Sequence, residues 1–205
     1  MNDTRVAGEE QSTLAAEVAA LTQPVFPSRQ LPKRQLRAAD QIVEILSQAG
    51  VRTVFGIPGG AIAPVYDALL DHPEIRVVTC KHETMAVFAA AAYARATDSV
   101  GVVLVTSGPG VTNAITGIAS AYCDSLPVLL LAGEVPRSQF GRGALQEGSA
   151  YTLDLRGMMQ SITKASYELT TAESTAAVLG KALATARSGR RGPVFLQLPL
   201  DVTRE

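Results

Sequence analysis

The sequence predicts a single α/β domain with a mostly parallel sheet of roughly six strands, covered by helices on both faces. A chain of 205 residues is long enough for one domain with its own buried core. Short Val/Leu/Ile runs alternate with segments of helical periodicity, which is typical of strand–helix–strand units. These runs are apolar at consecutive positions, as in parallel strands that are buried on both faces.

The composition excludes several classes of protein. Lys and Arg number 18 against 19 Asp and Glu, and this net charge of -1 argues against a nucleic-acid-binding surface. The longest apolar runs, such as 126–133, are far shorter than the roughly 20 residues of a membrane span. The 2 cysteines are too few for a disulfide scaffold. We interpret Cys80 and Cys123, both in apolar surroundings, as buried free thiols, and therefore expect a reducing, cytoplasmic location.

Residues 1–36 differ from the rest and are interpreted as an N-terminal extension that is partly flexible. Prolines punctuate this polar stretch, while Leu14, Val18 and Leu21 have the spacing of one helical face. The segment is either a mobile tail with a transient helix or an arm that docks on a partner. Its acidic residues are atypical of a transit peptide.

The first half of the domain, which we expect to span 37–205, begins with a helix at 38–48. Its apolar residues share one face, and Gly50 follows as a stop signal. A short apolar strand is then expected, followed by a helix, a second strand and a second helix. Their expected ranges are 53–57, 62–70, 75–80 and 82–97.

The second half continues the alternation of strands and helices. The apolar runs at 100–106 and 127–132 predict strands on either side of a helix at 111–121. A Gly-rich loop is expected next, then a helix at 172–187 and a last strand at 193–198.

The helix at 82–97 has small residues all round, with alanine at seven positions. A helix that is apolar on every side is typically buried on every side. It is therefore either a core helix of this domain or a helix with one side packed on a second domain or subunit. Small side chains would allow a close approach in both cases.

Three motifs follow strands, at the edge of a parallel sheet where ligands bind. Gly56-Ile-Pro-Gly-Gly60 would let a backbone approach a ligand, although a tight strand–helix turn explains it as well. Ser107-Gly-Pro-Gly-Val-Thr-Asn113 lacks the Lys-Ser/Thr of a P-loop, and Asn113 could either cap a helix or present its amide. Glu83 opens the alanine-rich helix, where it either suits the helix dipole or serves as a partly desolvated catalytic carboxyl.

Taken in order, these motifs resemble the pyrimidine-binding domain of thiamine-diphosphate enzymes of the acetohydroxyacid (acetolactate) synthase type. The resemblance covers about residues 36–203. Further matching segments are Tyr93-Ala-Arg-Ala-Thr97, Ala121-Tyr-x-Asp-Ser125, Val135-Pro136, Gln146-Glu147, Ile162-Thr-Lys164 and Arg191-Gly-Pro-Val194.

The resemblance implies thiamine diphosphate as the cofactor. Glu83 would hydrogen-bond N1′ of its aminopyrimidine and so favour loss of the thiazolium C2 proton, after which the cofactor attacks a 2-oxo acid and carbon dioxide leaves. Pro109 and Asn113 would flank the pyrimidine. Gly59 and Gly60 would form the backbone turn near the reacting carbon.

The resemblance also implies a substrate pocket that contains Gln146, the active-site glutamine of the synthases. Ala61 and Leu145 belong to the same expected pocket. Leu145 stands where the synthases usually carry Phe, while Ala92 and Asp98 replace glycines. These departures bear on substrate choice and on a domain contact rather than on the cofactor.

No Gly-Asp-Gly motif occurs in this sequence, although the family binds the diphosphate and Mg²⁺ through a second domain that carries it. We therefore expect no metal ligands here, and a partner subunit that holds Mg²⁺ in a hetero-oligomer such as α2β2. Whether FAD is present is left open. The alternatives are a non-catalytic paralogue, an excised domain of a longer synthase, or a simple 2-oxo acid decarboxylase subunit.

Overall fold

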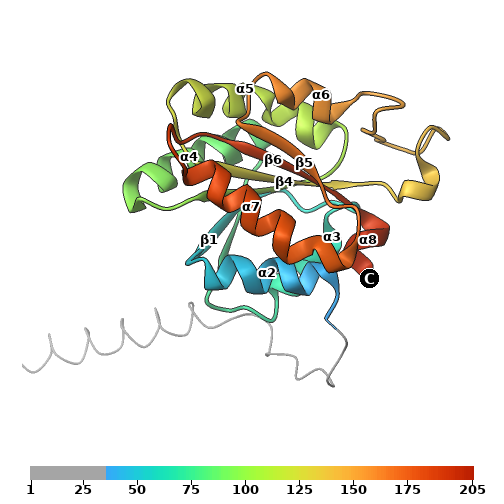
Figure 1. Ribbon diagram of the computed structural model, residues 1–205, viewed down its shortest axis with the longest axis horizontal. Coiled ribbons are helices and arrows are strands. Elements are labelled where there is room, and N and C mark those ends of the chain that lie inside the picture. The colour runs from blue at the N-terminus through green and yellow to red at the C-terminus, as the bar shows by residue number, and fades with distance from the viewer. Residues whose placement is uncertain (1–35) are drawn as a thin grey trace, which may run out of the picture. The chain divides into compact units, whose positions relative to one another are not determined.

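The fold is known from a computed structural model that describes residues 36–205. Its centre is an all-parallel sheet of six strands in the order β2-β1-β3-β4-β6-β5 (Figure 1). The strands are β1 (Thr53–Gly56), β2 (Arg76–Thr79), β3 (Gly101–Val105), β4 (Val128–Glu134), β5 (Ala165–Glu168) and β6 (Val194–Pro199). The expected α/β class and parallel sheet are confirmed.

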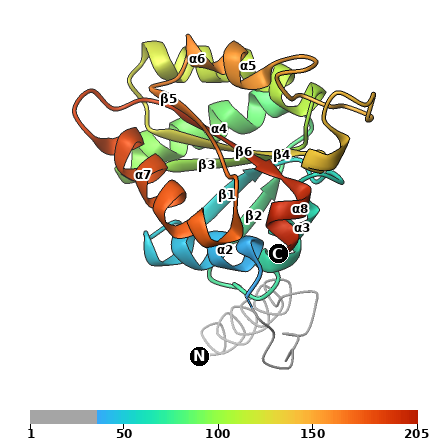
Figure 2. The same ribbon diagram turned by 45° about the vertical axis from the view of Figure 1, so that its right-hand side comes forward.

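Helices cover both faces of the sheet (Figures 1 and 2). One face packs against α2 (Ala38–Gln48), α3 (Ala63–Leu69), α7 (Thr175–Arg187) and α8 (Leu200–Arg204). The other packs against α4 (Glu83–Thr97), α5 (Pro109–Cys123) and α6 (Leu155–Gln160). Side chains of β3 alternate between the two resulting cores, because successive residues of a strand point to opposite faces.

The first helix ends as the sequence predicts. Ala49 caps α2, and Gly50 follows with a φ of 83°, a left-handed conformation that costs glycine little. At the other end, the Arg37 guanidinium lies 2.6 Å from Asp40 and 2.9 Å from Asp67, and so links α2 to α3.

The segment between β4 and α7 is more ordered than the loop expected from its glycines. It contains β5, α6 and two short 3-10 helices, η1 (Arg137–Gln139) and η2 (Ala172–Ser174). The Ala-Ser-Tyr-Glu sequence of β5 is not an apolar run, because this strand lies at the edge of the sheet and is only half-buried. The expected loop was therefore wrong for β5 and α6, and α8 was also missed.

The order of the strands reverses between β1 and β3. After β1 the chain passes to α3 on one face, whereas after β3 it passes to α5 on the other. The two connections diverge above the carboxyl ends of neighbouring strands, which is where open α/β sheets bind ligands. The motifs that follow β1 and β3 thus lie at a topological switch point.

The alanine-rich helix α4 is not enclosed on every side by the described residues. One face, which includes Ala86, Ala90 and Ala94, is buried against the sheet and α5. The opposite face exposes 59% of Met85 and 39% of Phe88, followed by exposed Ala92. The described residues thus leave one side of this helix open, and its packing on a second domain or subunit stays a prediction.

Three other expectations have different outcomes. Cys123 is exposed and Cys80 only partly buried, so the prediction of buried thiols was wrong. Cys123 is the last residue of α5 and lies off the stripe that ends with buried Ala121. The helix expected around 14–21 lies outside the described residues. Within 36–205, no helix is both long and apolar enough to cross a membrane.

Candidate functional site

The turn after β1 lies very close to the end of β3. A Cβ at Gly59 would come within 2.6 Å of the Thr106 Cβ, so only glycine permits this approach. At Gly60, by contrast, a Cβ would meet no atom within 4 Å. The paired glycines therefore do two things: the first packs the turn on the sheet, and the second leaves open space beside it.

Glu83 and Asn113 lie together at the adjoining starts of α4 and α5. The Asn113 amide nitrogen donates to Oε2 of Glu83 over 3.0 Å, and the Thr84 hydroxyl donates to the Asn113 carbonyl. His82 caps α4, with its Nδ1 accepting from the Thr84 backbone N–H at 3.2 Å. Only 8% of Glu83 is exposed. The Asn113 side chain thus acts on Glu83 rather than as a helix cap, since α5 begins earlier, at Pro109.

The loop that carries Gln146 folds back against the end of β3. The Ser107 hydroxyl lies 2.7 Å from the Gln146 carbonyl oxygen. A Cβ at Gly108, whose φ is 56°, would come within 2.8 Å of the same oxygen. Gln146 itself has a φ of 61°, which is uncommon for a residue with a side chain. The turn after β3 therefore packs closely against the backbone of Gln146.

A cavity of about 470 Å³ opens where the connections after β1, β3, β4 and β6 meet. Four predicted residues line it, namely Gly60, Ala61, Leu145 and Gln146. The loop that brings in Leu145 and Gln146 projects beyond the carboxyl ends of the strands (Figure 2). Leu145 is 86% exposed.

The structure thus arranges the predicted residues in two groups. Gly60, Ala61, Leu145 and Gln146 share the cavity, whereas Glu83 and Asn113 form a separate pair. Gly59 and Pro109 belong to the connections after β1 and β3, outside the cavity lining. The roles assigned to these residues stay predictions.

A fully buried carboxylate at the end of β4, Glu134, was not singled out from the sequence. Its Oε1 lies 2.8 Å from both the Ser107 hydroxyl and the Val135 N–H, and the Gly148 N–H lies 3.2 Å from each oxygen. Gln197 donates its amide to Oε2 over 2.6 Å. Through Ser107 and Gly148, Glu134 supports both sides of the Gln146 loop.

A second buried carboxylate, Glu147, follows Gln146 directly. Its Oε1 accepts hydrogen bonds from the Gly141 N–H, at 2.7 Å, and from the Ser149 hydroxyl. Its Oε2 has no partner among the described residues. The sequence showed Glu147 as part of a motif, but gave no sign of its burial.

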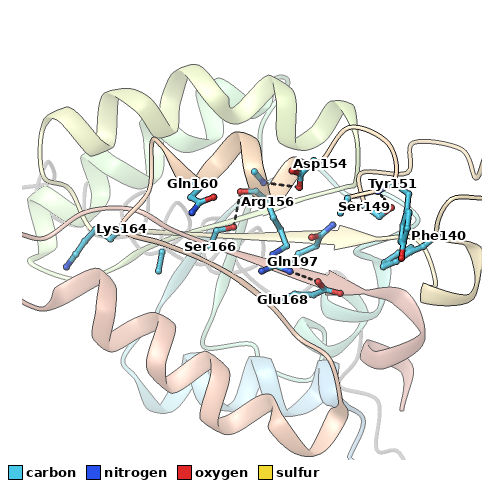
Figure 3. Close-up of a pocket in the computed structure, with 13 residues that line it drawn as sticks. Phe140, Ser149, Tyr151, Asp154, Arg156, Gln160, Lys164, Ser166, Glu168 and Gln197 are labelled. Carbon is cyan, nitrogen blue, oxygen red and sulfur yellow. Dashed lines mark hydrogen bonds and ion pairs between the residues drawn. The ribbon is translucent and has the colours of Figure 1, made fainter.

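A larger cavity of about 610 Å³ lies elsewhere, between α6 and the edge strand β5 (Figure 3). None of the predicted site residues lines it. Its polar groups pair with one another: Arg156 with Glu168 at 2.8 Å, the Ser166 hydroxyl with the Arg156 carbonyl, and Asp154 with the Gly157 N–H. Because these groups are already satisfied, the size of this cavity does not make it the candidate site.

Within 36–205, no group of three or more His, Cys, Asp or Glu side chains is placed to hold a metal ion.

Comparison with known proteins identifies the family. Residues 36–153 match the family described as "Thiamine pyrophosphate enzyme, N-terminal TPP binding domain". The large subunit of acetolactate synthase isozyme 3 from Escherichia coli (strain K12) is 47% identical over 167 residues, which are 82% of this chain and 28% of that protein. A probable acetolactate synthase large subunit from Methanocaldococcus jannaschii is 42% identical over 167 residues, 82% of this chain and 27% of that protein.

The acetolactate synthase large subunit of Haemophilus influenzae gives a similar result, with 42% identity over 168 residues, 82% of this chain and 28% of that protein. The chain thus spans little more than a quarter of the length of the curated relatives it matches. Together with the parallel fold and the motifs at its switch point, the match over 36–153 shows that this chain belongs to the thiamine pyrophosphate enzymes, through their N-terminal TPP-binding domain.

Proposed function

We propose that this chain supplies the pyrimidine-binding half of a thiamine-diphosphate-dependent enzyme that acts on 2-oxo acids. We propose decarboxylation followed by carboligation as the reaction, and relatives that are named acetolactate synthases support it. The observation that carries the proposal is the hydrogen bond from Asn113 to the buried carboxyl of Glu83, between the helices that follow β3 and β2 in a TPP-binding domain.

The residues present fit the aminopyrimidine of thiamine diphosphate. Asn113 donates to Oε2 of Glu83, while none of the described residues donates a hydrogen bond to Oε1. A carboxyl held on one side can share a proton with a ring nitrogen on the other, because burial excludes competing water. When bound, the cofactor supplies a carbon nucleophile and a place for the electrons released by decarboxylation.

Asn113 orients the carboxyl in this arrangement. Thr84 on α4 donates to the Asn113 backbone while the Asn113 side chain donates to Glu83 on α4, so the two helix starts are joined twice. Such double joining restricts the rotation of Glu83. A carboxyl with fixed orientation is what proton transfer to a single ring atom requires.

The diphosphate and Mg²⁺ sites are proposed to lie on a diphosphate-binding subunit, in a hetero-oligomer such as α2β2. The open face of α4, formed by Met85, Phe88 and Ala92, is apolar and belongs to the helix that begins with Glu83. Exposed apolar surface of this kind typically marks an interface. A partner on this face would contact the helix that begins with Glu83, whose carboxyl lies on the buried side.

The test is reconstitution of this chain with the diphosphate-binding subunit, thiamine diphosphate and Mg²⁺. Pyruvate is supplied, and carbon dioxide, acetaldehyde and acetolactate are measured. Acetolactate would indicate carboligation, and acetaldehyde alone would indicate simple decarboxylation. We expect Glu83→Gln to lower turnover by about 100-fold or more, because it removes a proton-transfer group.

The matched control is Glu173→Gln, which neutralises an exposed carboxylate in η2. It is expected to leave turnover unchanged. Equal turnover of wild type and Glu83→Gln, or no cofactor-dependent turnover of any 2-oxo acid, would refute the proposed function.

A further inference from the structure

The cavity that contains Gln146 has a strongly asymmetric charge. Its lining holds one charged side chain, Arg204 of α8, and no carboxylate. The remaining lining is neutral, with polar Thr106, Gln139 and Gln146 beside apolar groups. Glu134 lies behind this lining, where Ser107 and Val135 already contact its carboxyl group. Among the described lining residues the charge is therefore that of Arg204, which favours an anion.

Arg204 has no counter-ion among the described residues. The two carboxylates nearest to it in sequence, Asp201 and Glu205, both pair with Arg137, at 2.7 Å and 3.8 Å. No ion pair or hydrogen bond of the Arg204 guanidinium itself is formed within 36–205. The charge of Arg204 is thus available to a ligand, because the neighbouring carboxylates Asp201 and Glu205 pair with Arg137 instead.

The position of Arg204 is fixed although its side chain is exposed. Val202 and Thr203, immediately before it, are buried, and Val202 packs in the core beneath α2 and α3. Leu200 and Arg204 are four residues apart on one face of α8, and both line the cavity. The cation therefore enters the cavity beside an apolar side chain.

We propose that Arg204 binds the carboxylate of the 2-oxo acid in this cavity. The inference rests on the proposed function, which supplies the substrate class. A guanidinium matches a carboxylate because its N–H groups can reach both oxygens. Ala61, Val135, Leu145 and Leu200 surround the cation with apolar surface, which suits the alkyl group of a small 2-oxo acid.

Diphosphate oxygens share the anionic chemistry of a carboxylate, so the experiment must separate the two sources. Oxamate serves as the unreactive carboxylate probe, and inorganic pyrophosphate as the diphosphate probe. Oxamide is the neutral analogue of oxamate. Binding to the full 205-residue chain is followed by NMR, through chemical-shift changes at Leu145 and Leu200.

We expect oxamate to shift these leucine signals at millimolar concentration, and oxamide to leave them unmoved. Arg204→Ala should weaken oxamate binding by about 10- to 100-fold, the range for a lost charge-assisted hydrogen bond. Arg204→Lys should restore part of it. Arg142→Ala, which removes an equal charge from an exposed loop position outside the cavity lining, should bind like wild type.

Turnover by the reconstituted enzyme gives a second readout. In Arg204→Ala we expect the KM for pyruvate to rise by a similar factor with little change in kcat, because binding alone is lost. The thiamine diphosphate concentration needed for half activity should stay the same. A reconstituted enzyme that is inactive although oxamate binds through Arg204 would refute the proposed function, and with it the 2-oxo acid as the ligand, while still supporting a carboxylate site at Arg204.

The inference is overturned if oxamate causes no shifts in the wild type. It is also overturned if Arg204→Ala leaves both oxamate binding and the KM unchanged. Pyrophosphate binding that is stronger than oxamate binding, and equally dependent on Arg204, would assign the cation to the diphosphate instead.

Discussion

At the residue scale, Glu134 accepts hydrogen bonds from four parts of the chain: Ser107 after β3, its own neighbour Val135, Gly148 in the loop, and Gln197 in β6. All four donors are neutral, and none of the ion pairs within 36–205 includes Glu134. The carboxyl group is therefore held by oriented dipoles, which act only while each donor keeps its place. This carboxylate couples the shape of the Gln146 loop to the sheet.

Substitutions at Glu134 should separate loss of the network from loss of charge. Glu134→Leu leaves several buried donors unpaired and should lower the free energy of unfolding by about 3–5 kcal/mol. Glu134→Gln should cost about 1 kcal/mol, because the Gln197 amide can turn its oxygen toward the new amide nitrogen. Urea unfolding at pH 7 measures both.

The control exchanges the carboxylate and the amide between Glu134 and Gln197. Gln197→Glu alone brings two carboxylates to a contact that is 2.6 Å in the wild type, and should destabilise strongly. Glu134→Gln with Gln197→Glu restores one carboxylate and one amide, and should recover most of the stability. A harmless Gln197→Glu, or a double variant no better than that single one, would contradict this view of the network.

At the element scale, α4 presents two alanine faces that should respond differently to a larger side chain. Ala90 is buried against β3, where a Cβ on Gly101 would meet the Ala90 carbonyl at 2.2 Å. Ala90→Leu should therefore overpack the domain by about 1–3 kcal/mol and lower Tm by about 3–10 °C. Calorimetry of the chain checks this.

Ala92→Leu is the matched change on the exposed face of the same helix. It should leave the Tm of the chain unchanged and weaken assembly with the partner, because the added methylenes meet the partner rather than the core. Light scattering and co-purification measure the assembly. Unchanged assembly in Ala92→Leu would argue that this face is not an interface.

The short helix α8 is held by Arg137, which gives a second prediction at this scale. Its Nε and backbone N–H donate to Asp201, and its Nη1 donates to the Thr170 carbonyl. Burial of Asp201 opposes ionisation, but the hydrogen bonds from Arg137 outweigh it and hold the pKa of Asp201 below its ordinary value. The folded state thus favours the ionised form of this carboxyl.

It follows that Asp201 stabilises the fold above about pH 5, and that its contribution is lost as the pH falls through its lowered pKa. Asp201→Asn should lower the free energy of unfolding at pH 7 by about 1 kcal/mol or less, since the pair is partly exposed. Below about pH 4 the difference from wild type should shrink. In contrast, Asp71→Asn, at an exposed position, should show no such trend in urea unfolding across this range. A pH-independent effect of Asp201→Asn would contradict the assignment.

At the scale of the whole molecule, most of the fold could be predicted because its central strands are apolar at consecutive positions. β3 and β4 are buried at every residue, so their sequences carry an unmistakable signal. β5 carries none, because an edge strand is free to use Ser and Glu. The bounds of α5 shifted by two residues at each end, where Pro109 begins the helix before its apolar stripe does.

The candidate site could also be predicted only in part. Glu83 and Asn113 could be predicted because each belongs to a motif directly after a strand, and parallel strands bring such motifs to one edge. The link between Glu134 and Gln197 could not be predicted, because it depends on the register of β4 and β6, in which Ala132 pairs with Gln197. A register between strands more than sixty residues apart is a property of the assembled sheet. The local sequences of β4 and β6 therefore do not reveal it.

The place of β6 in the sheet has a consequence for biosynthesis. β6 pairs with β4 on one side and with β5 on the other, yet it comes last of these six strands along the chain. Until residues 194–199 emerge, β4 offers a bare edge and β5 has no neighbour in the sheet. Bare edges recruit other chains, and parallel pairings over long separations form slowly. The nascent chain thus passes through a stage in which its strand edges are unpaired. A chaperone that shields these edges would favour the native pairing of β6 over aggregation.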